Sequence, residues 1–206
     1  MKIKLCGVKN LCEIEMMNEF LPDYVGFVLA KSQREISAEK AKILCSNLDK
    51  KIRSVGVFVN ENIEEIAKKA RIIGLDVVQL HADETEDYIK KLRRILPEIE
   101  IWKAVRVSRV EDILAGENLS CDKILFDSFS KKSVGGTGKL IDQKLLKQCK
   151  SERDFFLAGG LNSENILEII NEINPYGVDI SSGIETNGSK DREKIEKIMR
   201  CLECLR

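Results

Sequence analysis

Residues 52–81, IRSVGVFVNENIEEIAKKARIIGLDVVQLH, contain two short apolar runs separated by a helical pattern. The runs cover residues 52–59 and 77–81, and both are rich in the β-branched residues that favour strands. Because residues 55–59 are apolar almost without interruption, they fit a strand covered on both faces, as in a parallel sheet. The stretch therefore predicts one strand, one helix and a second, parallel strand.

The same unit recurs along the whole chain. Apolar runs begin about 21 to 32 residues apart, which is the length of a strand, a helix and two connecting loops. Eight runs are expected to be strands: residues 3–6, 24–29, 52–59, 77–81, 101–107, 123–127, 155–158 and 177–181. Helical stripes are expected at 162–173, with Asn162 or Ser163 as the N-cap, at 88–96, closed by Pro97, and at the C-terminus. The weak pattern after residues 101–107 predicts a short helix there.

Eight strand–helix units predict a single-domain (β/α)8 TIM barrel spanning residues 1–206, near the short end of the length range of that fold. A chain of 206 residues, 43% of them hydrophobic, is long enough for one substantial core. The alternative is an open, doubly wound sheet. Residues 6–10, CGVKN, disfavour it because they lack the Gly-x-Gly-x-x-Gly turn that binds dinucleotides after a first strand.

The charge pattern points to a small-molecule partner. The 34 basic and 34 acidic residues cancel and are interspersed, which disfavours binding to nucleic acid or to an anionic membrane. No apolar stretch reaches the roughly 18 residues of a transmembrane helix, and the N-terminus turns to charge and glycine too soon for a signal peptide. We therefore expect a cytoplasmic protein.

Cysteine and histidine usage disfavours a metal site. The seven cysteines are an odd number and are widely scattered, which indicates reduced thiols. Cys201 and Cys204 form a Cys-x-x-Cys pair, but no second pair completes a four-ligand zinc site. His81 is the single histidine, so a site with several histidine ligands is excluded. A structural role is the alternative to a functional role for this residue.

Reactive residues collect at the ends of the predicted strands, where barrel enzymes carry their chemistry. Cys6 ends the first strand and Asp127 the sixth, so the two side chains could transfer protons as base and acid. The alternative for Cys6 is a buried apolar cysteine. A carboxylate that ends an apolar strand, such as Asp127, is costly to bury without a partner, and Asp179 is an alternative acid.

The loops after the last two strands predict a phosphate site. Gly160 follows the seventh strand, and Ser182 and Gly183 follow the eighth. Glycine permits close approach of the backbone to an anion, although ordinary tight turns would have the same composition. Arg34 could clamp a substrate carboxylate, and the alternative is a solvated arginine on an exposed loop. The Gly-rich residues 134–139, VGGTGK, lack the spacing of a nucleotide-binding loop, and a lid over the site is the favoured interpretation.

With these residues in place, the chain resembles the phosphoribosylanthranilate isomerases of tryptophan biosynthesis along essentially its whole length. The resemblance is carried by the order and spacing of segments 4–7 (KLCG), 26–28 (GFV), 31–34 (KSQR), 55–60 (VGVFVN), 78–81 (VQLH), 135–139 (GGTGK), 157–161 (LAGGL) and 178–185 (VDISSGIE). It implies a (β/α)8 barrel that acts without a cofactor. The reaction is an Amadori rearrangement of N-(5-phosphoribosyl)anthranilate, an aminoaldose, to an aminoketose.

The resemblance also implies roles for individual residues. Asp127 matches the general acid that protonates the furanose ring oxygen, and Cys6 matches the general base that removes the C2 proton of the sugar. Arg34 matches the residue that meets the anthranilate carboxylate. Gly160, Ser182 and Gly183 match the phosphate loops, and His81 is placed with the substrate-binding residues.

Three positions depart from the pattern of the family without removing a reacting group: Leu29, Gln33 and Ala82. They put substrate affinity in doubt more than reaction type. The alternative enzyme is another sugar-phosphate isomerase, such as the related Amadori isomerase of histidine biosynthesis, which uses two aspartates where this chain offers Cys6 on its first strand. A non-enzymatic alternative is a phosphate-binding module or a cysteine-based metal protein. We expect a monomer or a homodimer.

Overall fold

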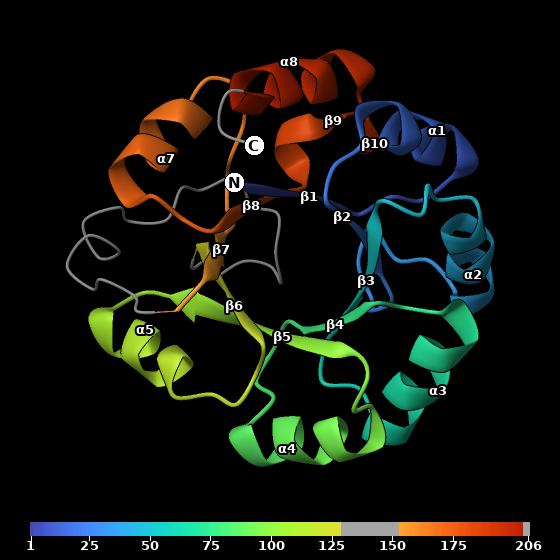
Figure 1. Cartoon of the computed structure of the whole chain (residues 1–206), viewed down its shortest axis with the longest axis vertical. Helices are drawn as coiled ribbons and strands as arrows, with labels where there is room; N and C mark the ends of the chain where they lie inside the picture. Colours follow the sequence, from blue (N-terminus) through green and yellow to red (C-terminus); the bar gives the residue numbers. More distant parts are fainter. Residues whose placement is uncertain (129–152, 204–206) are drawn as a thin grey trace.

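A computed structural model describes residues 1–128 and 153–203 of the chain. Eight parallel strands follow one another around a closed barrel in sequence order, and helices form a ring outside them (Figure 1). The first strand is bonded to both the second and the eighth, with Lys4 opposite Tyr24 on one side and Asp179 on the other. The predicted (β/α)8 barrel is confirmed. The alternative of an open doubly wound sheet is wrong because the sheet closes on itself.

Each strand of the barrel overlaps the apolar run that predicted it. The strands are β1 (Lys2–Cys6), β2 (Tyr24–Val28), β3 (Arg53–Phe58), β4 (Val77–Leu80), β5 (Glu100–Val107), β6 (Lys123–Ser128), β7 (Phe155–Leu157) and β8 (Gly177–Ile180). Because most side chains of these strands are apolar, neither face of the sheet is suited to contact with water. A sheet inside a ring of helices requires this composition.

Each described helix follows one of these strands along the chain. They are α1 (Leu11–Phe20), α2 (Ala38–Ser46), α3 (Ile63–Ile73), α4 (Glu86–Ile95), the short α5 (Val110–Glu117), α7 (Ile166–Ile173) and α8 (Arg192–Leu202). Five of them begin at a side chain that accepts a hydrogen bond from the first turn, namely Asn10, Ser37, Asn62, Thr85 and Asp191. Pro97 follows the end of α4, as predicted.

The helix after β7 begins later than predicted. Its N-cap is Asn165 rather than Asn162 or Ser163, so the prediction of the cap was wrong. The Asn165 side chain donates to the main-chain oxygen of Gly160 at 3.0 Å and accepts from the main-chain nitrogen of Asn162 at 2.9 Å. The Asn165 side chain therefore shapes the glycine turn that follows the strand, while the side chain of Asn162 accepts from the main-chain nitrogen of Glu164 at 2.8 Å.

A short hairpin after β8 was not predicted. A 3-10 turn, η1 (Ser182–Ile184), leads into the antiparallel strands β9 (Glu185–Thr186) and β10 (Ser189–Lys190). The residues between these strands, Asn187 and Gly188, have φ values of 52° and 76°. Positive φ at both central residues is the geometry that Asn-Gly hairpin turns adopt, so this dipeptide was a signal for the hairpin.

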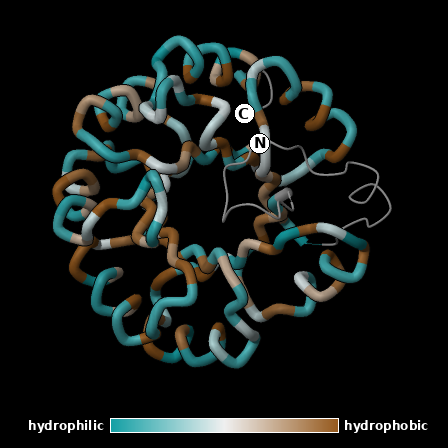
Figure 2. Tube along the Cα trace, turned by 180° about the vertical axis from the view of Figure 1, so that it is seen from behind, coloured by the Kyte–Doolittle hydropathy of each residue, from teal (hydrophilic) through white to brown (hydrophobic). Residues whose placement is uncertain are grey.

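Two hydrophobic layers hold the barrel. Inside it, Trp102 stacks on Phe156 with ring centroids 4.5 Å apart, and Tyr24 meets both rings edge-on at 4.8 and 5.6 Å. Outside it, apolar residues of the strands and helices form one buried cluster, and Figure 2 shows many hydrophobic residues along the inner ring of the trace. The barrel interior around these rings is thus a packed core rather than a pore.

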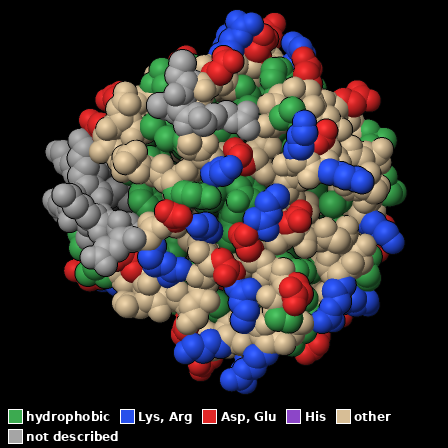
Figure 3. All heavy atoms as spheres, viewed as in Figure 1, with side chains coloured by type: hydrophobic (Ala, Val, Ile, Leu, Met, Phe, Trp, Pro, Cys, Tyr) green, Lys and Arg blue, Asp and Glu red, His purple; other side chains and the backbone are tan. Residues whose placement is uncertain are grey.

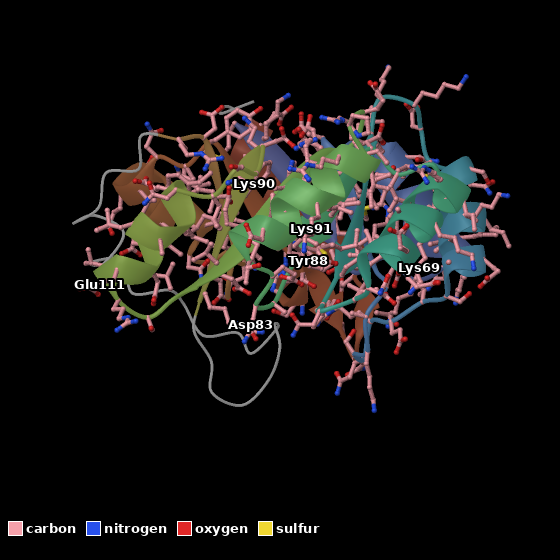
Figure 4. The ribbon with its side chains drawn as sticks, turned by 90° about the horizontal axis from the view of Figure 1, so that it is seen from below. Lys69, Asp83, Tyr88, Lys90, Lys91 and Glu111 are labelled. Atoms are coloured by element: carbon pink, nitrogen blue, oxygen red, sulfur yellow. The ribbon has the colours of Figure 1, made fainter. Side chains whose placement is uncertain are left out.

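Charged side chains of both signs cover the outer surface. Figure 3 shows hydrophobic side chains at the centre of one face, with Lys or Arg and Asp or Glu interspersed around them. Figure 4 views the barrel from the side, with Lys69 on α3, Tyr88 on α4 and Asp83 on the loop after β4. Lys69 forms an ion pair of 2.6 Å with Glu61, and the Tyr88 hydroxyl donates to the main-chain oxygen of Glu61. The Tyr88 contact ties the neighbouring α4 unit to the loop before α3, and the ion pair lies within the β3–α3 unit.

Candidate active site

The strand pleat directs a set of polar side chains into one mouth of the barrel. Val77 and Leu125 belong to the interior core, and side chains two residues further along a strand point the same way. Gln79 and His81 therefore face inward at the end of β4, and Asp127 does so near the end of β6. Asp127 is only 8% exposed. The mouth is thus lined by side chains from strands far apart in sequence.

Cys6 reaches the same mouth from β1. Lys4 is paired with Tyr24 in the sheet, and Tyr24 belongs to the interior core, so Lys4 and then Cys6 project inward. Cys6 is 8% exposed. A Cβ atom on Gly26 of β2 would lie 2.5 Å from the Cys6 sulfur, so the glycine leaves the room that the thiol occupies. The structure brings the predicted pair, Cys6 and Asp127, to one mouth of the barrel.

The Cys6 thiol lies among charged groups of both signs. Burial raises its pKa above the ordinary value, Lys4 and Lys190 lower it, and Asp179 raises it. Lys190 also donates to the main-chain oxygen of Cys6. A thiol with a raised pKa is mostly protonated near neutral pH, and the positive charges around it favour the thiolate.

Asp179 had been considered as an alternative acid. The structure pairs it with Lys4, whose Nζ lies 2.7 Å from Asp179 Oδ2. The Lys4 side chain is completely buried and that of Asp179 is 7% exposed. The sequence analysis missed Lys4, although a lysine two residues before Cys6 on an inward-facing strand was a signal for a buried charge.

Two side chains hold Asp127 through successive hydrogen bonds: His81, directly after β4, contacts Asp127, and Gln79 of β4 contacts His81. The His81 Nε2 atom lies 3.3 Å from Asp127 Oδ2, and the Gln79 Nε2 atom lies 3.0 Å from His81 Nδ1. When the Gln79 amide donates to Nδ1, the ring proton resides on Nε2, and His81 donates to the Asp127 carboxylate. The prediction that His81 binds substrate stays a prediction, because its two ring nitrogens contact protein groups here.

Arg34 lies over the end of β1. A Cβ atom on Gly7, whose φ is 87°, would lie 2.5 Å from the Arg34 side chain, so glycine permits this close approach. Arg34 binds Glu185 with two hydrogen bonds, of 2.8 Å from Nε and 2.6 Å from Nη2. Arginine has five N–H groups, so three remain that Glu185 does not use. These could meet a substrate carboxylate beside Cys6.

Glu185 connects Arg34 to the support of Cys6. It also accepts from Lys190 Nζ at 2.8 Å. Burial raises the pKa of Glu185, but the hydrogen bond from Arg34 and the charge of Lys190 outweigh this effect and lower the pKa to about 2. The carboxylate is therefore ionised at neutral pH. The sequence analysis missed both Glu185 and Lys190, which the unpredicted hairpin carries.

The predicted phosphate loops line one cavity. Its volume is about 410 Å³, and its lining includes Gly160, Asn162, Ser163, Glu164, Ser182, Gly183, Lys194 and Lys197. A Cβ atom on Gly183 would lie 1.9 Å from the main-chain oxygen of Leu161, so the two loops touch only because residue 183 is glycine. The structure thus brings Gly160, Ser182 and Gly183 together, as the sequence predicted. Two lysines of α8 were missed, although their spacing of three residues places both on one side of a helix.

Comparisons with known proteins identify the family. The model of the N-(5'phosphoribosyl)anthranilate (PRA) isomerase family matches residues 3–200. The chain belongs to this family. An N-(5'-phosphoribosyl)anthranilate isomerase of Clostridium acetobutylicum is 46% identical over 97% of both chains, and one of Thermoanaerobacter pseudethanolicus is 43% identical over 100% of this chain and 99% of the relative. The crystal structure of phosphoribosyl anthranilate isomerase from Thermotoga maritima is 34% identical, with a TM-score of 0.88 and 99% of each chain covered.

These findings confirm the predicted enzyme class and reaction. The N-(5'-phosphoribosyl)anthranilate isomerase family acts in tryptophan biosynthesis. A similar solved structure, 34% identical with a TM-score of 0.83 over 99% of both chains, is a complex of this isomerase with reduced 1-(O-carboxyphenylamino)-1-deoxyribulose 5-phosphate. The match favours this assignment over the related histidine-pathway isomerase, which was the alternative.

Two features of the sequence extend beyond the described residues. The Gly-rich residues 134–139, interpreted as a lid, lie outside the described residues, as does Cys204 of the Cys-x-x-Cys pair. Over residues 1–128 and 153–203, no group of three or more His, Cys, Asp or Glu side chains could hold a metal ion. In the same residues, no helix is long and apolar enough to cross a membrane.

Proposed function

We propose that this chain converts N-(5-phosphoribosyl)anthranilate to 1-(2-carboxyphenylamino)-1-deoxyribulose 5-phosphate by general acid and base catalysis, with residues 1–206 acting as one catalytic domain. The observation that carries the proposal is the position of Cys6 and Asp127 at one mouth of a barrel whose family match covers residues 3–200. The reaction moves hydrogen within the substrate and therefore consumes no oxidant or reductant.

In the proposed mechanism, Asp127 protonates the ring oxygen of the sugar, so that the ring opens to a Schiff base between C1 and the anthranilate nitrogen. Cys6 then removes the proton from C2, and the electron pair of that bond forms an enolamine. The enolamine then takes up a proton at C1 and loses the proton of its C2 hydroxyl group, which gives the ketone. His81 and Gln79 hold the Asp127 carboxyl group in place through their hydrogen bonds.

The substrate would be held at both ends. The phosphate fits the cavity formed by Gly160, Ser182 and Gly183, where Lys194 and Lys197 add positive charge. The anthranilate carboxylate would meet the N–H groups of Arg34 that Glu185 leaves unused. A substrate held in this way would have C1 and C2 of its sugar near Cys6 and Asp127.

The partner is proposed to be this small sugar phosphate, with neither nucleic acid nor membrane involved. One similar structure shows mutually generated monomers of the dimeric isomerase of Thermotoga maritima. For this chain we propose a monomer or a homodimer. A cytoplasmic location is proposed because the family catalyses a biosynthetic reaction on a phosphorylated intermediate.

The test follows the loss of phosphoribosylanthranilate fluorescence in the presence of the purified protein. We expect turnover, and we expect Cys6→Ala and Asp127→Asn each to lower kcat by at least about 100-fold with the fold intact. The matched controls are Cys12→Ala on α1 and Asp87→Asn on α4, which make the same chemical changes outside the barrel mouth and should leave kcat within about twofold. Conversion of a histidine precursor instead of phosphoribosylanthranilate would refute the assignment.

A further inference from the structure

The ion pair beneath Cys6 is a buried charge that the proposed mechanism does not use. Lys4 and Asp179 lie opposite each other on β1 and β8, with a distance of 2.7 Å between Lys4 Nζ and Asp179 Oδ2. The second oxygen, Asp179 Oδ1, is buried and has no hydrogen-bond partner among the described residues. Burying such a pair costs several kcal/mol in desolvation for each ion, and apolar residues of similar size often stabilise a fold equally well. Stability alone therefore gives no reason for this pair.

The pair lies inside the barrel, next to the thiol and further from the mouth. Lys4 and Cys6 are two residues apart on β1, so their side chains leave the strand in the same direction. Because both groups are out of water, the charge of Lys4 acts on the thiol with little screening. A thiolate at Cys6 would become a second anion available to Lys4, in competition with Asp179.

We propose that the Lys4–Asp179 pair sets the charge state of the Cys6 thiol, with Lys4 favouring the thiolate and Asp179 opposing it. Lys4 is then a positioning residue for the proton transfer at C2, and Asp179 limits its effect. The proposal rests on the proposed function only for its catalytic consequence, because the charge of the thiol can be measured without substrate.

Other charged groups also act on Cys6. Lys190 of β10 donates to its main-chain oxygen, and the positive charge of Arg34, on the loop after β2, interacts with the thiol. Both of these are engaged by Glu185, with contacts of 2.8 Å to Lys190 Nζ and 2.6 Å to Arg34 Nη2. Changing Lys4 and Asp179 leaves that second network in place.

The test measures how fast iodoacetamide alkylates Cys6 as a function of pH. The tryptic peptide that ends at Lys9 contains Cys6 and no other cysteine, so mass spectrometry follows this thiol alone. The double variant Lys4→Met/Asp179→Asn removes both charges and leaves no buried ion unpaired. We expect its alkylation below pH 8 to be about tenfold slower than in the unchanged protein, because a nearby opposite charge lowers a pKa by about one unit or more.

The single variant Asp179→Asn should have the opposite effect. It leaves Lys4 without its competing carboxylate, so we expect alkylation about threefold faster or more at the same pH. A purely structural role for the pair would shift both variants in the same direction. If Asp179→Asn fails to fold, the double variant still decides the question.

The matched control is another buried pair, Lys103 and Glu84, with side chains 6% and 1% exposed and 3.1 Å between Nζ and Oε2. Lys103→Met/Glu84→Gln removes the same charges from β5 and the loop after β4. We expect it to leave the pH dependence of Cys6 alkylation unchanged. The proposal would be overturned if Cys6 in the Lys4→Met/Asp179→Asn protein were alkylated as fast as in the unchanged protein. It would also be overturned if the control variant showed the same slowing.

The acidic limb of the profile of kcat/KM against pH should move with the thiol in both variants. Absence of turnover with the shifts in alkylation present would refute the proposed function and leave this inference standing. Turnover with no shift in alkylation would do the reverse.

Discussion

Replacing Glu185 by Gln tests whether the network beside Cys6 is held by charge. Glu185 accepts two hydrogen bonds from Arg34, of 2.8 and 2.6 Å, and one of 2.8 Å from Lys190. Its side chain is 9% exposed. The amide introduced by Glu185→Gln would keep the size of the side chain but remove the charge that both cations face.

The expected loss of stability can be worked out from the pKa of the Glu185 carboxyl group. Its pKa falls from an ordinary value of 4.5 to about 2 in the fold. At about 1.4 kcal/mol for each pH unit, the ionised carboxylate contributes about 3 kcal/mol of stability. Two facts reduce this figure: Arg34 is 20% exposed, and burial lowers the pKa of Lys190 even beside Glu185. We therefore expect Glu185→Gln to lower the free energy of unfolding by about 2 kcal/mol at pH 7.

The sign of the pH dependence follows from the same values. A carboxyl group with a lowered pKa stabilises the fold at any pH above its unfolded value and loses that contribution as the pH falls toward the folded value. The difference in stability between Glu185→Gln and the unchanged protein should thus be constant above about pH 5 and shrink as the pH falls from 4.5 toward 2.

Urea unfolding measured by circular dichroism at several pH values gives these free energies. The matched control is Glu61→Gln, which breaks the 2.6 Å pair with Lys69, where both side chains are 25% exposed. That variant should lose less than about 1 kcal/mol. Equal losses in the two variants at pH 7, or a difference for Glu185→Gln that grows toward acid, would refute the reasoning.

Two substitutions test the phosphate cavity and the barrel core. Gly183→Ala would place a methyl group 1.9 Å from the main-chain oxygen of Leu161, so the two phosphate loops must separate; steady-state kinetics should show KM raised by at least about tenfold with a smaller change in kcat, and an unchanged KM would contradict this use of the cavity. Trp102→Ala removes a ring that is completely buried and stacked on Phe156; urea unfolding should show a loss of about 3–5 kcal/mol, and a loss below about 1 kcal/mol would contradict the packing described for the barrel interior.

The architecture could be predicted from the sequence because the fold depends on a repeating local pattern. Each apolar run is short and most are followed by a helical pattern, and both properties are encoded within about 30 residues. The positions of Cys6 and Asp127 at strand ends could be predicted for the same reason, since the barrel brings the carboxyl ends of all strands to one mouth. The Asn187-Gly188 turn shows that a local signal was also present where the hairpin went unpredicted.

Only the tertiary structure decided which charged groups meet. Lys4 and Asp179 are 175 positions apart, and Arg34 and Glu185 are 151 apart. Their contacts depend on the register between β1 and β8 and on the closure of the barrel, which no local periodicity records. A lysine or a glutamate looks the same in the sequence whether it faces water or a buried partner. The effect of the Lys4–Asp179 pair on Cys6 arises only when folding removes the water between these groups.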